Sequence, residues 1–485
     1  MPATKNNINI LMASAELAPL AKVGGLADVL GSLPKALLKH QLKLSIVLPF
    51  YGCIDTKKYQ TKLIKKGINI EIDHSKQSFD LYQTYLPATK IPVFLIKHNL
   101  FKGNYIYANQ AGARSDIERF TFFSKAVVVL IHELAWSVDI IHCHDWHTAL
   151  IPSYVDEYSL KYSNFSNIKT LLTIHNLASQ GTSGLDFFEH ASLNKKLNPA
   201  LLEEYYDQDG EQVDLLKIGI LSADYISTVS PTYAREILTK QYGCGLDLYL
   251  QRRYKHLSGI LNGIDTVIFN PQTDKSIAKK YNQTNFTLGK QANKISLQKK
   301  LKLERADYPL FGIVTRLVEQ KGFDILLPAL EKFLHNNKAQ IVILGTGHKN
   351  IENQLKELAK HYPNSLSLNL GFDLGLAQLI YAGSDFFLMP SYFEPCGLGQ
   401  MIAMRYGSLP LVRATGGLKD TVINNKNGLV FNNYQINDLA KVMQEAVKIY
   451  ANKTQLKRMI ALAMSSDWSW DLSAQKYLKL YNKII

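Results

Sequence analysis

Short apolar runs alternate with helical patterns along most of the chain. In the first half, runs short enough to be buried strands lie at 9–14, 44–49, 92–96, 140–143, 170–174 and 225–229. In the second half, similar runs lie at 309–315, 339–344, 365–370, 386–389 and 409–412. Between them, segments such as 116–134 and 324–334 carry apolar residues at helical spacing. Strands that alternate with helices in this way predict α/β structure with doubly wound parallel sheets.

The alternation occurs twice, which bears on the number of domains. A chain of 485 residues is too long for a single core. Each half also contains the sequence Gly-Gly-Leu-x-Asp, at Gly24–Asp28 and at Gly416–Asp420. We therefore predict two similar α/β domains that face one another. The terminal segment 472–484 has helical spacing, and its apolar stripe must pack against another element. The stripe consists of Leu472, Tyr477, Leu480 and Tyr481.

Composition and charge limit the possible partners. The chain is 46% hydrophobic and 20% charged, which is ordinary for a globular protein. Its formal net charge of +14 would suit a nucleic acid or an anionic membrane. However, the lysines are scattered along helical segments instead of forming a basic arm, so we expect neither partner. Such a field still favours a small anionic ligand.

The cysteines and the apolar runs bear on location. The four cysteines are far apart in the chain and form no Cys-x-x-Cys pair, which argues against a zinc ribbon and favours a reduced compartment. The first apolar strand is reached by Ile8, so we expect no signal peptide. No apolar run approaches the ~20 residues that span a bilayer. We therefore expect a cytoplasmic protein.

Glycine-containing turns follow several predicted strands, where ligands bind in parallel α/β sheets. In the first half, Lys22 precedes Gly24 and Gly25 at a helix start, a place that offers backbone N–H groups to a phosphate. The dinucleotide fingerprint GxGxxG is absent there. In the second half, Glu394 and the Gly416–Gly417 pair follow two adjacent apolar strands. These turns predict a ligand cleft.

Histidines follow two strands of the first half. The segment HCHDWH (142–147) would suit a metal site by composition. Neighbouring residues of an extended segment point to opposite faces, so we expect them to line a ligand cleft and to bind no metal. His175 and Asn176 form a second polar pair at a strand end.

Three cations at strand-to-helix turns, namely Lys22, Arg316 and Lys321, predict a site for a diphosphate. Phe372 follows another strand and could stack on a base, and Glu394 could orient a polyhydroxylated substrate. Side-chain cations would then replace Mg²⁺ in stabilising a leaving group. This combination indicates transfer of a group away from a nucleotide diphosphate.

The motifs of the chain resemble bacterial glycogen synthase and plant starch synthase. They occur in the same order over nearly the whole chain: KVGGLADV, HDWH, TIHN, SPTYAREI, GILNGID, TRLVEQKG, EPCGLGQ and TGGLKDT. The resemblance implies the GT-B fold, with two Rossmann-like domains and a deep cleft between them. It implies an N-terminal domain of residues 1–262 on the acceptor side, joined by the terminal helix 468–485. Residues 263–467 would form the nucleotide-sugar-binding domain.

The activity implied by the resemblance is that of a hexosyltransferase. It would transfer glucose from ADP-glucose to the non-reducing end of an α-1,4-glucan such as glycogen, with retention of configuration and with no cofactor or metal. In the first domain, His175 would be catalytic at the glucosyl group, and Asp28 and Asp145 would face the sugar or the acceptor. The donor-binding residues implied in this domain are Lys22, Gly24, Gly25 and Asn176.

In the second domain, the resemblance assigns catalytic roles to three charged residues. Arg316 and Lys321 would neutralise the departing diphosphate, and Glu394 would bind sugar hydroxyls and stabilise positive charge at the reacting carbon. Many retaining GT-B enzymes carry a second glutamate eight positions later, where this chain has Ile402, which excludes a two-glutamate mechanism. The donor-binding residues implied here are Phe372, Cys396, Gly397 and Gly417.

Three alternatives to this function stay open from the sequence. A retaining glycosyltransferase of the same fold could use UDP-glucose, since the Lys-Gly and Gly-Gly-Leu turns would serve either donor. A catalytically silent glucan-binding protein is disfavoured because the charged residues and His175 are all present. A nucleic-acid-binding protein would be revealed by binding to a duplex at physiological salt.

Overall fold

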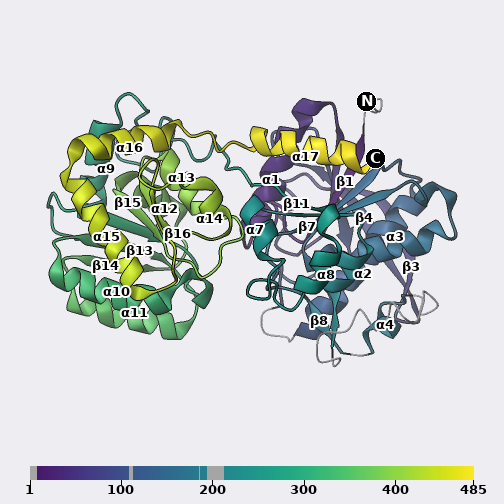
Figure 1. Cartoon of the computed structure of the whole chain (residues 1–485). Coiled ribbons are helices and arrows are strands. Elements are labelled where there is room, and N and C mark those ends of the chain that lie inside the picture. The colour runs from purple at the N-terminus through teal and green to yellow at the C-terminus, as the bar shows by residue number, and fades with distance from the viewer. Residues whose placement is uncertain (1–7, 109–112, 185, 194–211) are drawn as a thin grey trace. The chain divides into compact units, whose positions relative to one another are not determined.

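The computed structural model describes residues 8–108, 113–184, 186–193 and 212–485 (Figure 1). The chain divides into two compact units. Unit 1 comprises Met1–Gly263 and Trp470–Ile485, and unit 2 comprises Ile264–Ser469. Each unit has its own β-sheet, covered by its own helices.

The sheet of unit 1 has nine strands in the order β11-β10-β7-β6-β1-β2-β5-β4-β3. Seven strands, from β11 to β5 in that order, pair in parallel. All of these except β11 are predicted from the sequence. The parallel strands are β1 (Asn9–Ala13), β2 (Lys43–Pro49), β5 (Pro92–Lys97), β6 (Ile140–His144), β7 (Lys169–Ile174), β10 (Tyr225–Thr228) and β11 (Leu257–Gly259).

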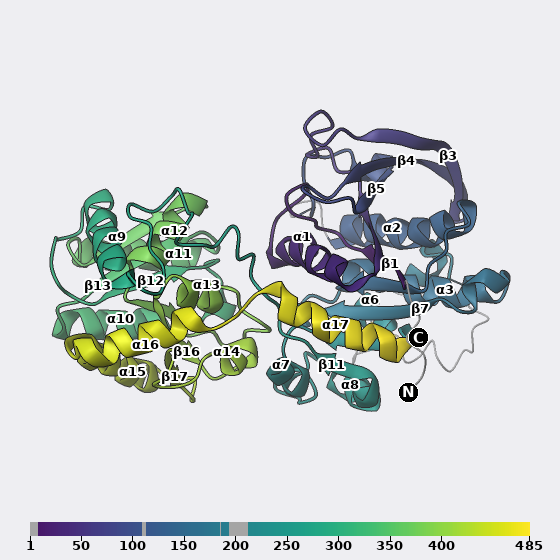
Figure 2. The same cartoon turned by 90° about the horizontal axis from the view of Figure 1, so that it is seen from above.

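The remaining two strands form an antiparallel hairpin that the sequence analysis did not predict. They are β3 (Lys62–Ile72) and β4 (Ser75–Tyr85), and β4 pairs antiparallel with β5 (Figure 2). β3 lies at the sheet edge and buries few side chains, chiefly Ile68, Ile70 and Ile72. Its lysines disguise the strand in sequence, and charged residues of this kind protect an exposed edge from further pairing.

The helices of unit 1 include one from the end of the chain. The others are α1 (Gly25–Leu37), α2 (Ala113–Glu133), α3 (Ile151–Ser159), α4 (Phe187–His190), α6 (Leu215–Ser222), α7 (Pro231–Glu236) and α8 (Asp247–Arg252). A short pair of strands, β8 (Thr182–Ser183) and β9 (Val213–Asp214), lies apart from the large sheet. At the start of α7, the Ser230 hydroxyl accepts a hydrogen bond from the Tyr233 amide, as its sequence predicts.

The last helix, α17 (Trp470–Ile484), packs against α1 (Figure 1). Tyr477, Leu480 and Tyr481 are buried, so most of the predicted stripe is correct. The prediction is wrong for Leu472, because its side chain is 46% exposed. At 3.6 residues per turn, the buried face runs through Trp470, and a position two residues later lies on the opposite side of the helix.

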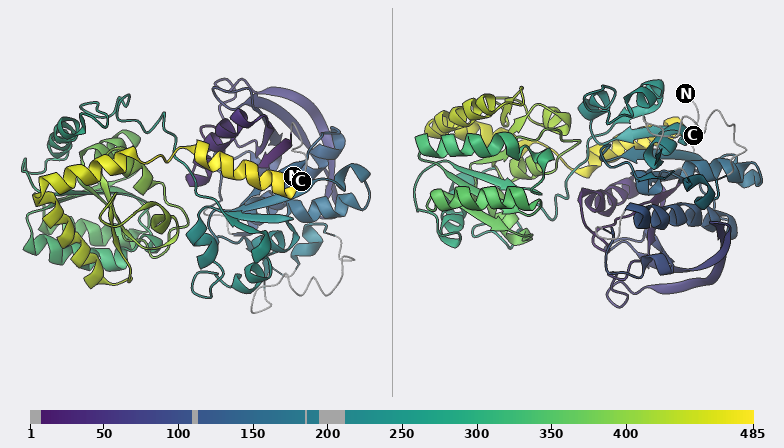
Figure 3. Two further views of the ribbon diagram at one scale, coloured as in Figure 1. Left: turned by 45° about the horizontal axis from the view of Figure 1, so that its top comes forward. Right: turned by 90° about the horizontal axis from the view of Figure 1, so that it is seen from below.

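The sheet of unit 2 has six parallel strands in the order β14-β13-β12-β15-β16-β17. They are β12 (Leu310–Val314), β13 (Gln340–Gly345), β14 (Leu366–Leu370), β15 (Phe386–Met389), β16 (Leu409–Arg413) and β17 (Leu429–Phe431). Helices cover both faces of this sheet (Figure 3). They are α9 (Phe286–Lys300), α10 (Phe323–Asn336), α11 (Lys349–His361), α12 (Leu374–Gly383), α13 (Gly399–Arg405), α14 (Gly416–Thr421), α15 (Ile436–Ala451) and α16 (Lys453–Ser465).

Each sheet has a point at which the strand order reverses, and ligands bind at the carboxyl ends of the strands there. In unit 1 this point is at β1, which lies between β2 and β6. In unit 2 it is at β12, which lies between β13 and β15. Within the described residues, none of the helices has the length and apolar character required to cross a membrane.

Candidate active-site residues in the two units

A buried carboxylate organises the turn between β1 and α1. Glu16 is 3% exposed, and its Oε2 accepts hydrogen bonds of 2.7 Å from the backbone N–H groups of Val23 and Gly24. Its Oε1 accepts a 2.7 Å hydrogen bond from the Tyr107 hydroxyl. The Gly24 amide, expected to face a donor phosphate, therefore donates to a carboxylate of the protein itself. Helix α1 then begins at Gly25 without a side-chain cap.

The lysine of the same turn is paired with another predicted residue. Lys22 Nζ lies 2.5 Å from Asp28 Oδ1, and the two side chains are 43% and 40% exposed. Surface ion pairs of this kind contribute about 0–1 kcal/mol. An anionic ligand can therefore displace Asp28 from Lys22 at small cost.

Three histidines meet at the carboxyl ends of β6 and β7. The rings of His142 and His144 lie 4.1 Å apart, because alternate residues of a strand share a face. His144 Nδ1 is 3.0 Å from His175 Nε2. His142 is held by Tyr481 at 2.9 Å and by Thr173 at 2.6 Å.

Burial controls the charge of this histidine cluster. It lowers the pKa of His142 and of His175 to about 3, and it lowers the pKa of His144 well below the usual value. All three imidazoles are therefore neutral at pH 7. Within the described residues, no group of three or more His, Cys, Asp or Glu side chains is arranged to hold a metal ion.

Asp145 positions the turn that carries His175 and Asn176. Its backbone has a φ of 58°, in the left-handed region, directly after β6. Its Oδ1 accepts hydrogen bonds from the amides of His175, at 2.6 Å, and of Asn176, at 3.4 Å. Burial raises the pKa of this carboxyl to about 7, although the two hydrogen bonds oppose the rise. The structure therefore brings three predicted residues of unit 1 together.

In unit 2, the predicted catalytic carboxylate is paired with a predicted catalytic lysine. Lys321 Nζ donates to Glu394 Oε1 at 2.9 Å and to Oε2 at 2.7 Å. The Ser391 hydroxyl donates to Oε2 at 2.9 Å. Only 15% of the Lys321 side chain and 8% of the Glu394 side chain is exposed. The pair joins the turn after β12 to the loop after β15.

Glycines allow the loops of unit 2 to approach each other. Gly322 has a φ of 77°, and a Cβ there would lie 2.2 Å from the carbonyl oxygen of Pro390. At Gly417, a Cβ would lie 2.1 Å from the carbonyl oxygen of Cys396. The Gly417 amide donates to the Glu394 carbonyl at 3.1 Å. Only glycine permits these contacts, and the one at Gly417 brings the start of α14 against the loop that carries the carboxylate.

The other predicted residues of unit 2 lie at the same edge of the sheet. Arg316 lies two residues after the end of the central strand β12, and it is exposed. Phe372 follows the outer strand β14, and it is 85% exposed. An aromatic side chain exposed to this extent is free to stack on a ligand.

The comparisons with known proteins cover nearly the whole chain. Residues 9–252 match the family "starch synthase catalytic domain", and residues 295–461 match "glycosyl transferases group 1". The chain is 45% identical to a glycogen synthase of Kosmotoga olearia, over 99% of this chain and 98% of that one. It is 43% identical to a glycogen synthase of Geotalea daltonii, over 99% of both chains. The chain belongs to the glycogen and starch synthase family.

Solved structures agree with this assignment to the glycogen and starch synthase family. The catalytic domain of starch synthase IV from Arabidopsis thaliana, bound to ADP and acarbose, superposes with a TM-score of 0.88 at 33% identity. The match covers 98% of this chain and 99% of that one. A sucrose-phosphate synthase from Thermosynechococcus elongatus, with a TM-score of 0.58 and 18% identity, shares the fold. The predicted family, GT-B fold and glycosyltransferase class are confirmed.

Several residues that hold the glycogen synthase motifs in place were missed from the sequence. Glu16 is one, because its hydrogen bonds to the KVGGL turn depend on how the loop folds back. Arg413 is another: it is 6% exposed, and its Nε donates to the Ser391 carbonyl at 2.8 Å. The Gln400 amide donates to the carbonyl oxygens of Cys396 and Gly397 at 3.1 and 2.9 Å. Their polar character in otherwise apolar surroundings was the only available signal.

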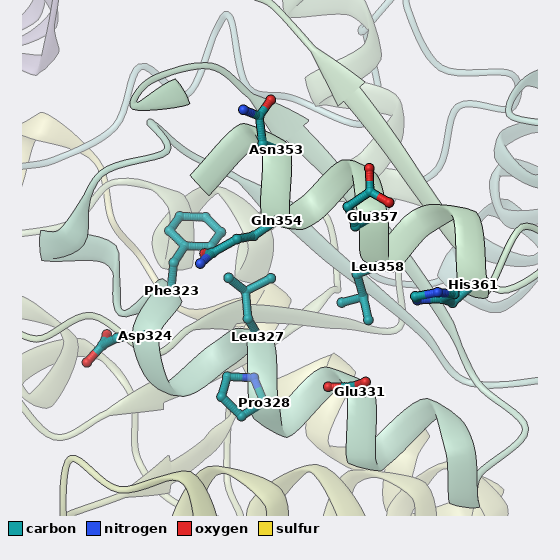
Figure 4. A pocket seen from close by; sticks show the side chains of 10 residues that line it. All are labelled: Phe323, Asp324, Leu327, Pro328, Glu331, Asn353, Gln354, Glu357, Leu358 and His361. Carbon is teal, nitrogen blue, oxygen red and sulfur yellow. The ribbon is translucent and has the colours of Figure 1, made fainter. Parts of the chain in front are cut away.

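A pocket of about 550 Å³ between α10 and α11 contains none of the predicted site residues (Figure 4). Its rim carries the carboxylates of Asp324, Glu331 and Glu357, together with His361 (Figure 4). Carboxylates repel a diphosphate, so this pocket is unsuited to a nucleotide-sugar donor.

Proposed function

We propose that the protein is a glycogen synthase that transfers glucose from ADP-glucose to the non-reducing end of an α-1,4-glucan, with retention of configuration. The observation that carries the proposal is the full-length similarity to glycogen synthases. The donor is supported by the related starch synthase structure, which was solved with ADP and acarbose bound. ADP-glucose and glycogen are the partners that we propose, in a cytoplasmic setting, with neither nucleic acid nor membrane.

The two units have different roles in this proposal. Unit 2 binds the nucleotide sugar, with Phe372 against the base and with Arg316 and Lys321 on the diphosphate. Unit 1 provides the acceptor side, where Lys22 contributes a further cation to the donor phosphates. Stabilisation of the charge that develops in the transition state usually contributes more to catalysis than any other single effect. These cations allow ADP to leave without requiring a metal ion.

Glu394 acts on the glucosyl group in the proposal. Both of its oxygens accept hydrogen bonds from Lys321, and one also accepts from Ser391. A carboxylate held in this way is a poor nucleophile, but it still places negative charge near a cationic reacting carbon. We therefore favour an electrostatic and sugar-binding role. Ile402 of α13, which is 6% exposed, offers no second carboxylate.

The neutral histidines suit the same reaction. The bond from the anomeric carbon to the phosphate oxygen breaks, and the electron pair leaves with ADP. The acceptor hydroxyl forms the new bond on the same face, and its proton passes to the departing phosphate. His175, held neutral by burial, adds no positive charge beside the cationic carbon while it positions the sugar.

A parallel donor assay tests the proposal. Incorporation of labelled glucose into glycogen should be at least tenfold faster with ADP-glucose than with UDP-glucose at equal concentration. Equal or faster use of UDP-glucose would favour the related UDP-glucose-dependent enzyme. If neither donor is turned over while glycogen still binds, the protein is a silent glucan-binding member of the family.

A further inference from the structure

A second groove lies in unit 2, between α9 and α16, and it shares no residue with the proposed donor site. Its cavity volume is about 540 Å³. One wall is a continuous face of α9, and the opposite wall is a face of α16. The charged lining residues are Lys290, Lys294, Arg305, Asp307, Asp385, Lys453 and Lys457.

A buried lysine with no carboxylate partner lines this groove. Lys290 is 7% exposed, and its Nζ donates to the carbonyl oxygens of Ala382, Ser384 and Tyr406 at 3.1, 2.8 and 3.2 Å. Among the described residues, no Asp or Glu forms an ion pair with it. Burial lowers the pKa of Lys290 to about 7. A neighbouring anion would favour its charged form.

The other charges of the groove leave an excess of cations. Lys294 Nζ is paired with Asp385 at 2.6 Å, and it also donates to the Tyr450 hydroxyl at 2.8 Å. Lys453 lies 3.6 Å from Asp307. Both acids of the lining are therefore already paired.

All three N–H groups of Lys290 are donated to backbone carbonyls, so the remaining cations of the groove are Arg305 and Lys457. Neither Arg305 nor Lys457 forms an ion pair with another described residue, and both are exposed. The first turn of α16, at Lys453, adds the positive end of a helix dipole. The groove thus combines two exposed, unpaired cations and a helix start.

We propose that this groove binds a small phosphomonoester. Its volume lies within the ~300–1,000 Å³ that is typical of small-molecule sites. A phosphoryl group carries about two negative charges and three acceptor oxygens, which match the unpaired cations. Thr287 and Gln291 lie on the same face of α9 and can hydrogen-bond to the hydroxyl groups of the ligand body.

The acidic pocket between α10 and α11 has a similar volume but carries the opposite charge. Volume alone therefore does not select the ligand, whereas the sign of the lining charges does. The two pockets therefore serve as internal controls for each other. A general attraction of anions to this basic protein would not distinguish Lys457 from other surface cations.

The experiment is calorimetric titration of the full chain with inorganic phosphate and with glycerol 3-phosphate at fixed ionic strength. The test variant is Lys457→Glu. The matched control is Arg458→Glu, which makes the same charge reversal on an exposed neighbour that does not line the groove. Arg316→Ala reports on phosphate binding at the proposed donor residues. Arg305→Gln gives a milder second test, and thermal melting shows that each variant is folded.

We expect Lys457→Glu to weaken phosphate binding at least tenfold and Arg305→Gln to weaken it severalfold, with Arg458→Glu within twofold of the unaltered chain. Tighter binding of glycerol 3-phosphate would support the contribution of Thr287 and Gln291. An equal loss in both glutamate variants would mean a general charge effect and would overturn the proposal. Loss only in Arg316→Ala, or no phosphate binding at all, would overturn it as well.

Discussion

The polar groups at the carboxyl ends of the strands differ between the two sheets. In unit 1, the residues around β1, β6 and β7 include neutral imidazoles and carboxylates that bind backbone amides, and the predicted cation there, Lys22, is paired with the partly exposed Asp28. In unit 2, the residues around β12 and β15 include the ion pair of Lys321 with Glu394 and the exposed cation Arg316. Both edges belong to similar parallel sheets, so the fold alone does not determine this difference.

The two units differ in what their carboxylates do: those of unit 1 position loops, and that of unit 2, in our proposal, stabilises charge in the reaction. Glu16 and Asp145 of unit 1 each use a carboxylate oxygen to hold two successive amides of a neighbouring turn. These hydrogen bonds fix the geometry of a loop. In unit 2, Glu394 and Lys321 are buried together, where electrostatic effects are stronger than in water. We therefore expect substitutions in unit 2 to reduce turnover most and those in unit 1 to act through loop position or stability.

The largest effect is expected from Glu394→Gln. The substitution keeps the shape of the side chain but removes the negative charge, so kcat for glucose transfer should fall about 10²–10³-fold. Initial rates with ADP-glucose and glycogen measure this. Glu319→Gln is the matched control, because Glu319 is exposed in the turn that carries Lys321. If both variants keep full turnover, Glu394 has no part in the chemistry.

A smaller effect is expected from Glu16→Ala, which frees the amides of Val23 and Gly24. The turn that carries Lys22 should loosen, and misplacement of a binding group by ~1 Å can cost up to ~10²-fold. We expect kcat/KM for ADP-glucose to fall about tenfold or more. Tyr107→Phe removes only one of the three hydrogen bonds to Glu16, so kcat/KM should fall less in this variant. Equal losses in the two variants would contradict the role of Glu16 in holding the turn.

The smallest effect concerns stability and pH at Asp145. Its pKa is raised to about 7 in the folded protein. The group therefore contributes stability below its ordinary pKa of about 4, and that contribution is lost as pH rises through about 7. Asp145→Asn cannot ionise, so its unfolding free energy should fall less between pH 5 and pH 8, by roughly 2–3 kcal/mol at ~1.4 kcal/mol per pKa unit.

Urea unfolding of both proteins at the two pH values measures this difference. Asp55→Asn is the matched control. Asp55 also accepts hydrogen bonds from two backbone amides, those of Lys57 and Lys58, but it is exposed. An identical pH response of Asp145→Asn and the unaltered protein would show that Asp145 does not titrate in this range.

Most parallel strands of both units are predictable because buried strands have continuous apolar runs bounded by polar turns. The three-residue strands β11 and β17 were missed, since they are too short to give such a run. The β3–β4 hairpin is not predictable in this way, since an edge strand with lysines on its exposed side lacks that pattern. Leu472 was misplaced because an apolar residue near a helix end can fall outside the buried face. Strand-end residues such as His175 and Glu394 were accessible from sequence, as their position follows from the strand pattern.

What the sequence could not provide is the set of contacts among those residues. The bonds from Glu16 to the Val23 and Gly24 amides depend on the three-dimensional path of a loop. The pairing of Lys321 with Glu394 joins residues that follow different strands, and it depends on the spatial order of those strands. Residue types identified the chemistry, whereas long-range packing determined which groups are already paired.

The most direct test is to identify the product that the unaltered protein forms from ADP-glucose and a short maltooligosaccharide. Nuclear magnetic resonance of the reaction mixture follows the anomeric proton of each newly added glucose. We predict new α-1,4 linkages at the non-reducing end, with the α configuration of the donor retained. A β-linked product, or release of free glucose without chain extension, would contradict the assignment of this chain as a retaining glycogen synthase.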